Sequence, residues 1–385
     1  MDSHSAPPYP PLVLTLAFPS LAHFLSPSSL SSPSLLAALS SAAARSDNLT
    51  VLVRTPTPTP WGAPPAASGS SSSSSSAPHP PHTTPLSLFL PLERALAALY
   101  SPCTAAFLKR GNVLASVDVV VEAVREVPFC VPAGVGSERW EYAADGGEAV
   151  SLSAAEEGGG EEERPEGQGA RAEGDGGIYD VVALGGTFDH LHAGHKILLS
   201  MACSIAARKV IVGVSDDTLL KNKKLPHLLE PLAARMRNVE RFMDLVRPGV
   251  EKEVVPLTDV YGPTAHDPTI RALVVSDETR SGGDAINELR KKKGLNELDV
   301  HVINLVADSP SPSSSFSSQP SSPLAPPSST SSAPAPSPAP AIKVEPAAKM
   351  GSTGIREWID RQQRLGTGAV VGGAGGGVDK AGGTI

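Results

Sequence analysis

The sequence predicts an α/β fold in which a parallel five-stranded sheet carries helices on both faces. Three observations predict it. Short apolar runs recur as strand candidates at 179–184, 209–214, 253–257, 272–276 and 300–306. Helical patterns separate several of these runs, and a Gly-rich turn follows the first one. Strands that alternate with helices form parallel sheets with right-handed crossovers.

The helical patterns are spaced for buried stripes. The first pattern is an amphipathic run from Ile197 to Ile205, directly after the Gly-rich turn. The second runs from Leu232 to Val246 with its apolar side chains on one face. A third pattern covers 284–293, and Ser352 is the expected N-cap of a closing helix.

Residues 1–140 give weaker α/β signals. Strand candidates at 12–16, 49–53 and 117–124 alternate with helix candidates at 35–44 and 93–100. A serine run at 70–76, flanked by Pro-rich stretches, predicts a disordered loop between them. We expect a diverged N-terminal α/β region, which contains no recognisable motif.

Three low-complexity segments divide the remaining chain. An acidic, Gly-rich linker covers 141–177, a Ser/Pro-rich insertion covers 308–346, and a Gly-rich tail covers 366–385. Such compositions bury too little apolar surface to offset the entropy of ordering, so we expect them to be disordered. The main domain is therefore expected at 178–307, completed by a C-terminal motif and helix at 347–365.

Charge and cysteine content exclude several classes of protein. The formal net charge is -8, and residues 141–177 alone carry 11 acidic and 2 basic side chains. The expected domains are thus near neutral, which argues against a nucleic-acid-binding face. The three cysteines have no metal-binding spacing, no apolar run is long enough to span a membrane, and no basic leader precedes Arg45. We expect a cytoplasmic protein without zinc.

The Gly-rich turn is the most informative segment. It reads Gly185-Gly186-Thr187-Phe188-Asp189-His190-Leu191-His192-Ala193-Gly194-His195, and we call it the first motif. The pattern places two imidazoles, His192 and His195, at a strand-to-helix turn. Backbone N–H groups and the helix dipole attract phosphate at such a turn. A lone histidine is usually structural, but two within this pattern indicate nucleotide phosphate chemistry.

The first motif resembles the signature of nucleotidyltransferases related to class I aminoacyl-tRNA synthetases. Lys349-Met350-Gly351-Ser352-Thr353-x-Ile355-Arg356, which we call the second motif, is similar to their second signature. Four further strings resemble the eukaryotic and archaeal branch of phosphopantetheine adenylyltransferase: Asp217-x-Leu219-Leu220-Lys221, Leu229-x-Pro231-x-Ala233-x-Arg235, Tyr261-Gly262-Pro263 and Val274-Val275-Ser276-x-Glu278-Thr279. The resemblance covers about 179–306 and 347–362 and implies a Rossmann-like sheet.

The resemblance implies a reaction in which ATP and 4′-phosphopantetheine give dephospho-coenzyme A and pyrophosphate. Mg²⁺ is implied by the triphosphate and would be held mainly by substrate phosphates. The chain contains no Gly-x-x-x-x-Gly-Lys-[Ser/Thr] string, so we expect any dephospho-coenzyme A kinase to be a separate chain.

The resemblance also assigns roles to residues. His195 would contact the α-phosphate, His192 would assist, and Thr187 with the backbone of Phe188 would hold reacting phosphates. Lys221 is the first choice for the lysine between the acceptor phosphate and ATP, with Lys223 and Lys224 as rivals. The other expected ligand-binding residues are Gly185, Gly186, Arg235, Ser276, Glu278, Thr279, Lys349, Ser352, Thr353 and Arg356.

Other functions stay open at this stage. A nicotinamide mononucleotide adenylyltransferase or a cytidylyltransferase would share the first motif, and a non-catalytic scaffold would suit the disordered linkers. Without the resemblance, Lys221 to Lys224 would be interpreted as a solvated loop. Gly351 stands where the signature usually has serine, which removes one hydroxyl from the expected triphosphate site.

Overall fold

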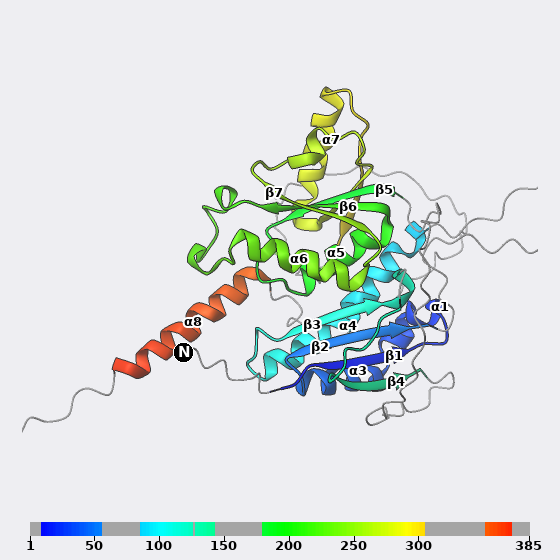
Figure 1. Ribbon diagram of the computed structural model, residues 1–385, viewed down its shortest axis with the longest axis vertical. Helices are drawn as coiled ribbons and strands as arrows, with labels where there is room; N and C mark the ends of the chain where they lie inside the picture. The colour runs from blue at the N-terminus through cyan, green and yellow to red at the C-terminus, as the bar shows by residue number, and fades with distance from the viewer. Residues whose placement is uncertain (1–8, 56–84, 126–127, 143–178, 305–350, 372–385) are drawn as a thin grey trace, which may run out of the picture.

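The computed structural model describes residues 9–55, 85–125, 128–142, 179–304 and 351–371. The described residues form two parallel sheets, one in each half of the chain (Figure 1). Of the three low-complexity segments expected from the sequence, 308–346 and all but the first two residues of 141–177 lie outside these residues. The expected tail at 366–385 is corrected at its start, because the last helix continues to Val371. We call residues 9–142 the N-terminal unit and residues 179–304 the C-terminal unit.

The C-terminal unit is the expected five-stranded parallel sheet. Its strands are β5 (Tyr179–Gly186), β6 (Ala206–Ser215), β7 (Glu251–Leu257), β8 (Ala272–Ser276) and β9 (Asp299–Ile303), in the spatial order β7-β6-β5-β8-β9. All neighbouring strands pair in parallel. The order reverses between β5 and β8, so the carboxyl end of β5 lies at a topological switch point, where open α/β sheets bind ligands.

Helices cover both faces of this sheet, as predicted. α5 (Ala193–Ile205) and α6 (Leu232–Val246) pack on one face, with Val182 and Leu184 of β5. α7 (Arg280–Lys292) packs on the other face through Ile286, with Val181 and Ala183. Alternate side chains of β5 thus pack into two apolar cores, one on each face of the sheet. This packing on both faces fixes the position of the carboxyl end of β5.

The N-terminal unit is a second parallel α/β layer. Its strands are β1 (Leu12–Ala17), β2 (Asn48–Arg54), β3 (Ser116–Val121) and β4 (Gly136–Glu141), in the spatial order β3-β2-β1-β4. Its helices are the short α1 (Leu21–Phe24) and α2 (Pro27–Leu30), then α3 (Pro33–Ala44) and α4 (Phe89–Lys109). The expected diverged α/β region is therefore an ordered sheet with its own helices.

Four elements of this unit differ from the prediction. The short helices α1 and α2 were not predicted. β4 was not predicted, because Trp140 is its single buried side chain and the strand lies at the edge of the sheet. α4 extends far beyond the predicted 93–100 and continues through Pro102. Side chains on several faces of α4, including Leu92, Ala98 and Tyr100, are buried.

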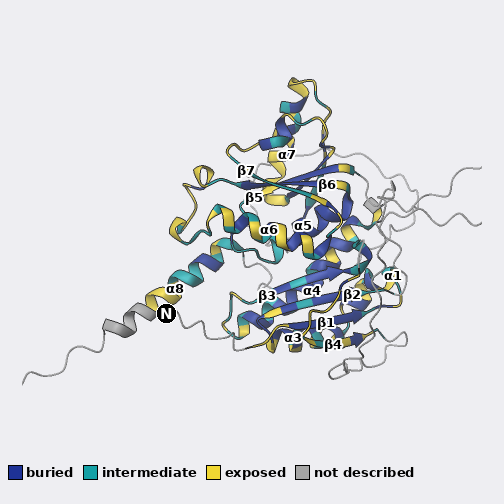
Figure 2. Ribbon diagram, viewed as in Figure 1, coloured by how far each residue is buried: buried dark blue, intermediate teal, exposed yellow. Residues whose placement is uncertain are grey.

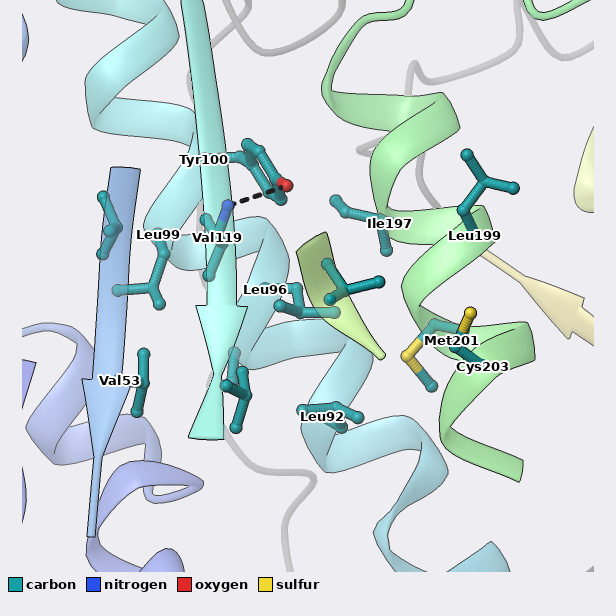
Figure 3. Packing of buried hydrophobic residues seen from close by; sticks show 14 of the residues in the cluster. Val53, Leu92, Leu96, Leu99, Tyr100, Val119, Ile197, Leu199, Met201 and Cys203 are labelled. Carbon is teal, nitrogen blue, oxygen red and sulfur yellow. Dashed lines mark hydrogen bonds between the residues drawn. The ribbon is translucent and has the colours of Figure 1, made fainter. Parts of the chain in front are cut away.

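The two units share one apolar core around α5. Every residue of α5 from Lys196 to Ile205 is buried, so this helix has no solvent-facing side after its first turn (Figure 2). Ile197 and Met201 point from α5 toward α4, whereas Leu199 points away from it (Figure 3). The sequence predicted an amphipathic helix with one exposed face. The structure corrects this, because the N-terminal unit covers that face.

α8 (Ser352–Val371) returns to the carboxyl edge of the C-terminal unit with its first turn and then extends away from both sheets (Figure 1). Its N-cap is Gly351, whose carbonyl accepts the first helical hydrogen bond, from Ile355, at 3.2 Å. This corrects the expectation that Ser352 would be the cap. Among the helices of the described residues, none combines the length and the apolar character needed to cross a bilayer.

Candidate active site

The first motif forms a tight loop between β5 and α5. Phe188 and His190 adopt left-handed backbone conformations, with φ of 50° and 46°. The Phe188 ring turns back under the loop and is fully buried. A Cβ at Gly186 would meet this ring at 3.2 Å, so glycine permits the close approach. The turn therefore delivers His192 directly to the start of α5.

His192 and His195 form a stacked imidazole pair in the first turn of α5. Their ring centroids are 4.0 Å apart with an interplanar angle of 26°, and Phe188 packs against His195 at 5.2 Å. Nδ1 of His195 is buried and has no hydrogen-bond partner among the described residues. Buried polar atoms are normally paired, so the unpartnered nitrogen marks this turn as a candidate site.

Both imidazoles are neutral at physiological pH. Burial lowers the pKa of His192 to about 4, with a further contribution from the charge of Lys196. Burial also lowers the pKa of His195 well below its usual value, helped by His192 and Lys223. The pair can therefore donate and accept hydrogen bonds without two adjacent positive charges, and an anionic ligand would favour its protonation.

Asp189 joins the two motifs, and sequence reasoning did not single it out. Its side chain is fully buried and accepts hydrogen bonds from the backbone of Glu230, at 2.8 Å, and from Arg356, with which it forms an ion pair. Its backbone oxygen accepts from the Ser352 hydroxyl at 2.7 Å. The sequence feature that could have pointed to Asp189 is that it is the single acidic residue of the first motif.

The start of α8 lies against the imidazole pair. A Cβ at Gly351 would be 3.8 Å from Nε2 of His192, an ordinary contact, so serine would fit there. The guanidinium of Arg356 is buried and also donates to Lys224 O, at 3.0 Å, and to Thr353 Oγ1, at 3.3 Å. Through these contacts, Arg356 holds the first turn of α8 against the first motif. Thr353 is exposed. Lys349 lies outside the described residues.

Arg235 supports the loop of the first motif through hydrogen bonds. Its side chain is fully buried and donates to four oxygens of the protein. Nε reaches Glu230 O at 2.9 Å, and Nη1 reaches Thr187 O at 3.0 Å and Ser215 O at 2.8 Å. Nη2 reaches Asp217 Oδ1 at 2.8 Å. Arg235 thus ties the first motif to the end of β6, and contact with a ligand stays a prediction.

The three candidate lysines are exposed at the same edge of the sheet. Lys224 pairs with Glu357 of α8 at 2.5 Å. Lys223 is one of the charges that lower the pKa of His195, which places it near the imidazole pair. The roles of Lys221, Lys223 and Lys224 at the phosphates therefore stay predictions.

The segment after β8 lies beside the first motif. β5 and β8 pair in a register that matches Leu184 with Val274, so Ser276 is expected at the level of Gly186. Hydroxyls of Ser276 and Thr279 lie 3.1 Å apart, and Glu278 between them is exposed. These residues border the site on the side opposite β6, and their contact with nucleotide stays a prediction.

Comparisons with known proteins match the segment that carries the first motif. The cytidylyltransferase-like family model matches residues 183–333. A phosphopantetheine adenylyltransferase of Saccharomyces cerevisiae is 49% identical over 128 residues, which are 33% of this chain and 42% of that protein. An uncharacterized protein of Schizosaccharomyces pombe is 44% identical over 126 residues, which are 33% of this chain and 40% of that protein.

An archaeal relative is matched over most of its length. The phosphopantetheine adenylyltransferase of Methanopyrus kandleri is 41% identical over 130 residues, which are 34% of this chain and 82% of that protein. The two fungal relatives are matched over about two fifths of their length. The chain belongs to the phosphopantetheine adenylyltransferase family.

Proposed function

We propose that this chain transfers the adenylyl group of ATP to 4′-phosphopantetheine, giving dephospho-coenzyme A and pyrophosphate. The imidazole pair carries the proposal, because the two stacked rings, one with an Nδ1 that has no partner among the described residues, stand at a helix start, where backbone N–H groups and the helix dipole attract phosphate. The relatives named phosphopantetheine adenylyltransferase support the choice of acceptor.

The reaction is an in-line displacement at the α-phosphorus of ATP. A phosphate oxygen of the acceptor forms the new bond, the bond from the α-phosphorus to the bridging oxygen breaks, and pyrophosphate leaves with the electron pair. The nucleophile is already anionic at neutral pH, so no general base is required. Positioning and stabilisation of charge then account for the rate.

The residues of the site divide this task. His195 would donate to the α-phosphate as charge develops there, and His192 would assist on the nucleotide phosphates. Thr187 and the backbone of Phe188 would hold the reacting groups, with a lysine from 221–224 between the two substrates. Ser352 and Thr353, at the start of α8, would bind the outer phosphates of ATP. Ser276, Glu278 and Thr279 would border the adenosine.

Magnesium fits the proposal as a partner of the substrate. Among the described residues, no group of three or more His, Cys, Asp or Glu side chains is arranged to hold a metal ion. The triphosphate implies Mg²⁺, which would be bound mainly by phosphate oxygens and water and would neutralise charge on the departing pyrophosphate.

We also place the reaction in the cytoplasm, with the following kinase step on another chain. The free cysteines Cys103, Cys130 and Cys203 support a reducing compartment.

An acceptor panel tests the reaction. The purified protein is incubated with Mg²⁺ and ATP or CTP, together with 4′-phosphopantetheine, nicotinamide mononucleotide or a phosphorylated alcohol. Pyrophosphate release is then measured. We expect release with ATP and 4′-phosphopantetheine. Release only with another acceptor, or only with CTP, would reject the substrate and keep the reaction class, whereas no release with any pair would favour the non-catalytic scaffold.

A further inference from the structure

Lys196 directly follows His195, the last residue of the first motif, but its side chain points away from the site toward the N-terminal unit. Its ammonium lies 2.6 Å from Asp118 Oδ1 and donates to Ser116 Oγ at 2.7 Å and Val117 O at 2.8 Å. An ammonium has three donors, and all three end on consecutive residues at the start of β3. β3 of the N-terminal unit therefore accepts all three hydrogen bonds of the Lys196 ammonium.

Because Lys196 is buried, its ammonium depends on these partners in β3. The residue is 4% exposed. A buried charge is tolerated only when it is paired, and removal of its partner is destabilising. Without β3, the ammonium would have to leave its present position. The start of β3 thus determines where the Lys196 side chain lies.

The backbone of Lys196 links the position of its side chain to the imidazole pair. Its N–H donates to the carbonyl of His192 at 3.0 Å, which closes the first turn of α5. His195 is the neighbouring residue in the same turn. The charge of Lys196 also contributes to the lowered pKa of His192. The position of Lys196 is therefore coupled to both imidazoles through one helical turn.

The N-terminal unit is an addition to the minimal chain of the family. The 130 matched residues are 82% of the Methanopyrus kandleri relative, so that protein has about 160 residues. It leaves no room for a unit of the size of residues 9–142. In the present chain, by contrast, α5 is buried against α4 (Figure 3). Its first turn is tied to β3 through Lys196.

We propose that Asp118 is a positioning residue for nucleotidyl transfer. Through Lys196, β3 of the N-terminal unit holds the first turn of α5 and with it His192 and His195 in the orientation that meets the α-phosphate. The N-terminal unit is in this way part of the active unit. This inference rests on the proposed function for its kinetic consequence, but the tether itself can be measured without turnover.

Asp118→Asn tests the tether in the full chain, because it removes the charge and keeps the shape. We expect kcat to fall between about 10-fold and about 100-fold, the scale for a small misplacement of reacting groups. KM for ATP should change less than about twofold, since the misplacement acts on the transition state. The ring signals of His192 and His195 in ¹H–¹³C correlation spectra should shift. Asp118→Glu, which restores a carboxylate, should recover part of kcat.

Asp180→Asn is the matched control. Asp180 pairs with Arg208 at 3.0 Å on the exposed surface of the C-terminal unit, so the same chemical change should leave kcat and the ring signals unaltered. If Asp118→Asn does not fold, the double variant Lys196→Met with Asp118→Leu removes both charges, a replacement that is often neutral for stability. We expect it to show the same loss of kcat.

Unchanged kcat and unchanged ring signals in a folded variant of either kind would overturn the inference. A wild-type protein that transfers no nucleotide would overturn the proposed function instead. The ring signals of the unliganded protein would then still decide whether Asp118 orients the imidazoles.

Discussion

At the scale of single residues, the site is prepared for an anion by two imidazoles that are neutral before it arrives. Stacking at 4.0 Å and burial keep both rings uncharged, and His195 Nδ1 has no partner among the described residues. A phosphate beside them would supply the missing partner and favour protonation. Binding and charge stabilisation therefore depend on the same atoms.

His195→Ala should lower kcat by roughly 10²–10³ while the fold survives, which is the scale for losing one transition-state donor. The ring packs on Phe188, but the turn itself is held by backbone and Asp189 contacts. Steady-state pyrophosphate release and circular dichroism would measure the two effects. His266→Ala, at an exposed histidine, is the control and should leave kcat unchanged. Full turnover in His195→Ala would contradict its role.

The same two imidazoles should make stability depend on pH. Their pKa values are lower in the folded than in the unfolded chain, so between pH 6.5 and about 4 the unfolded chain binds more protons. The free energy of unfolding therefore falls as pH drops through this window, by up to about 3 kcal/mol for His192. Denaturant titrations from pH 7.5 to 4.5 would show it, and His192→Asn should flatten the curve. A curve that does not change in this variant would assign the dependence to other groups.

At the scale of elements, α8 is fastened to the first motif by its first turn. The buried pair of Asp189 and Arg356 is the centre of this attachment, and Ser352 adds a hydrogen bond to the backbone of Asp189. The second motif is thereby brought beside His192 although more than 150 residues separate the two motifs.

Arg356→Met should therefore destabilise the chain by about 3–5 kcal/mol, because it leaves Asp189 buried without its counter-ion. Lys224→Met removes the exposed pair with Glu357 and should cost less than about 1 kcal/mol. Chemical denaturation of both variants measures the difference. The double variant Arg356→Met with Asp189→Leu should recover much of the loss. Equal costs for Arg356 and Lys224 would show that the buried pair does not hold α8.

The elements also show what the sequence could and could not predict. α6 and β8 have the bounds that their apolar patterns indicate, 232–246 and 272–276, because each pattern matches the burial of one element. β4 escaped prediction, since an edge strand with one buried side chain has no apolar period. In the site, the imidazole pair follows from local spacing. The partners of Asp189 and Lys196 do not, because they come from distant segments.

At the scale of the whole molecule, the two units are built alike and share a core. The order β3-β2-β1-β4 repeats the order of the first four strands of the C-terminal unit, β7-β6-β5-β8, with parallel pairing throughout. The N-terminal unit lacks the first motif. It contributes instead the cover of α5, whose residues after the first turn are all buried. The N-terminal unit thus replaces water on one side of the helix that carries the imidazoles.

A cut between the units should leave them associated. Each large apolar side chain of α5 that faces α4, such as Ile197 or Met201, loses about 1.5–3 kcal/mol of burial when exposed, and the pair of Lys196 and Asp118 would also be broken. We expect a protease site placed within 143–177 to be cleaved without loss of kcat, and both pieces to elute together from a sizing column. A chain that begins at residue 178 and lacks the N-terminal unit should aggregate or melt at a lower temperature, and co-expression of residues 1–142 should restore it. Separate elution of the cut pieces, with the second piece stable and active by itself, would show that α5 does not need this cover.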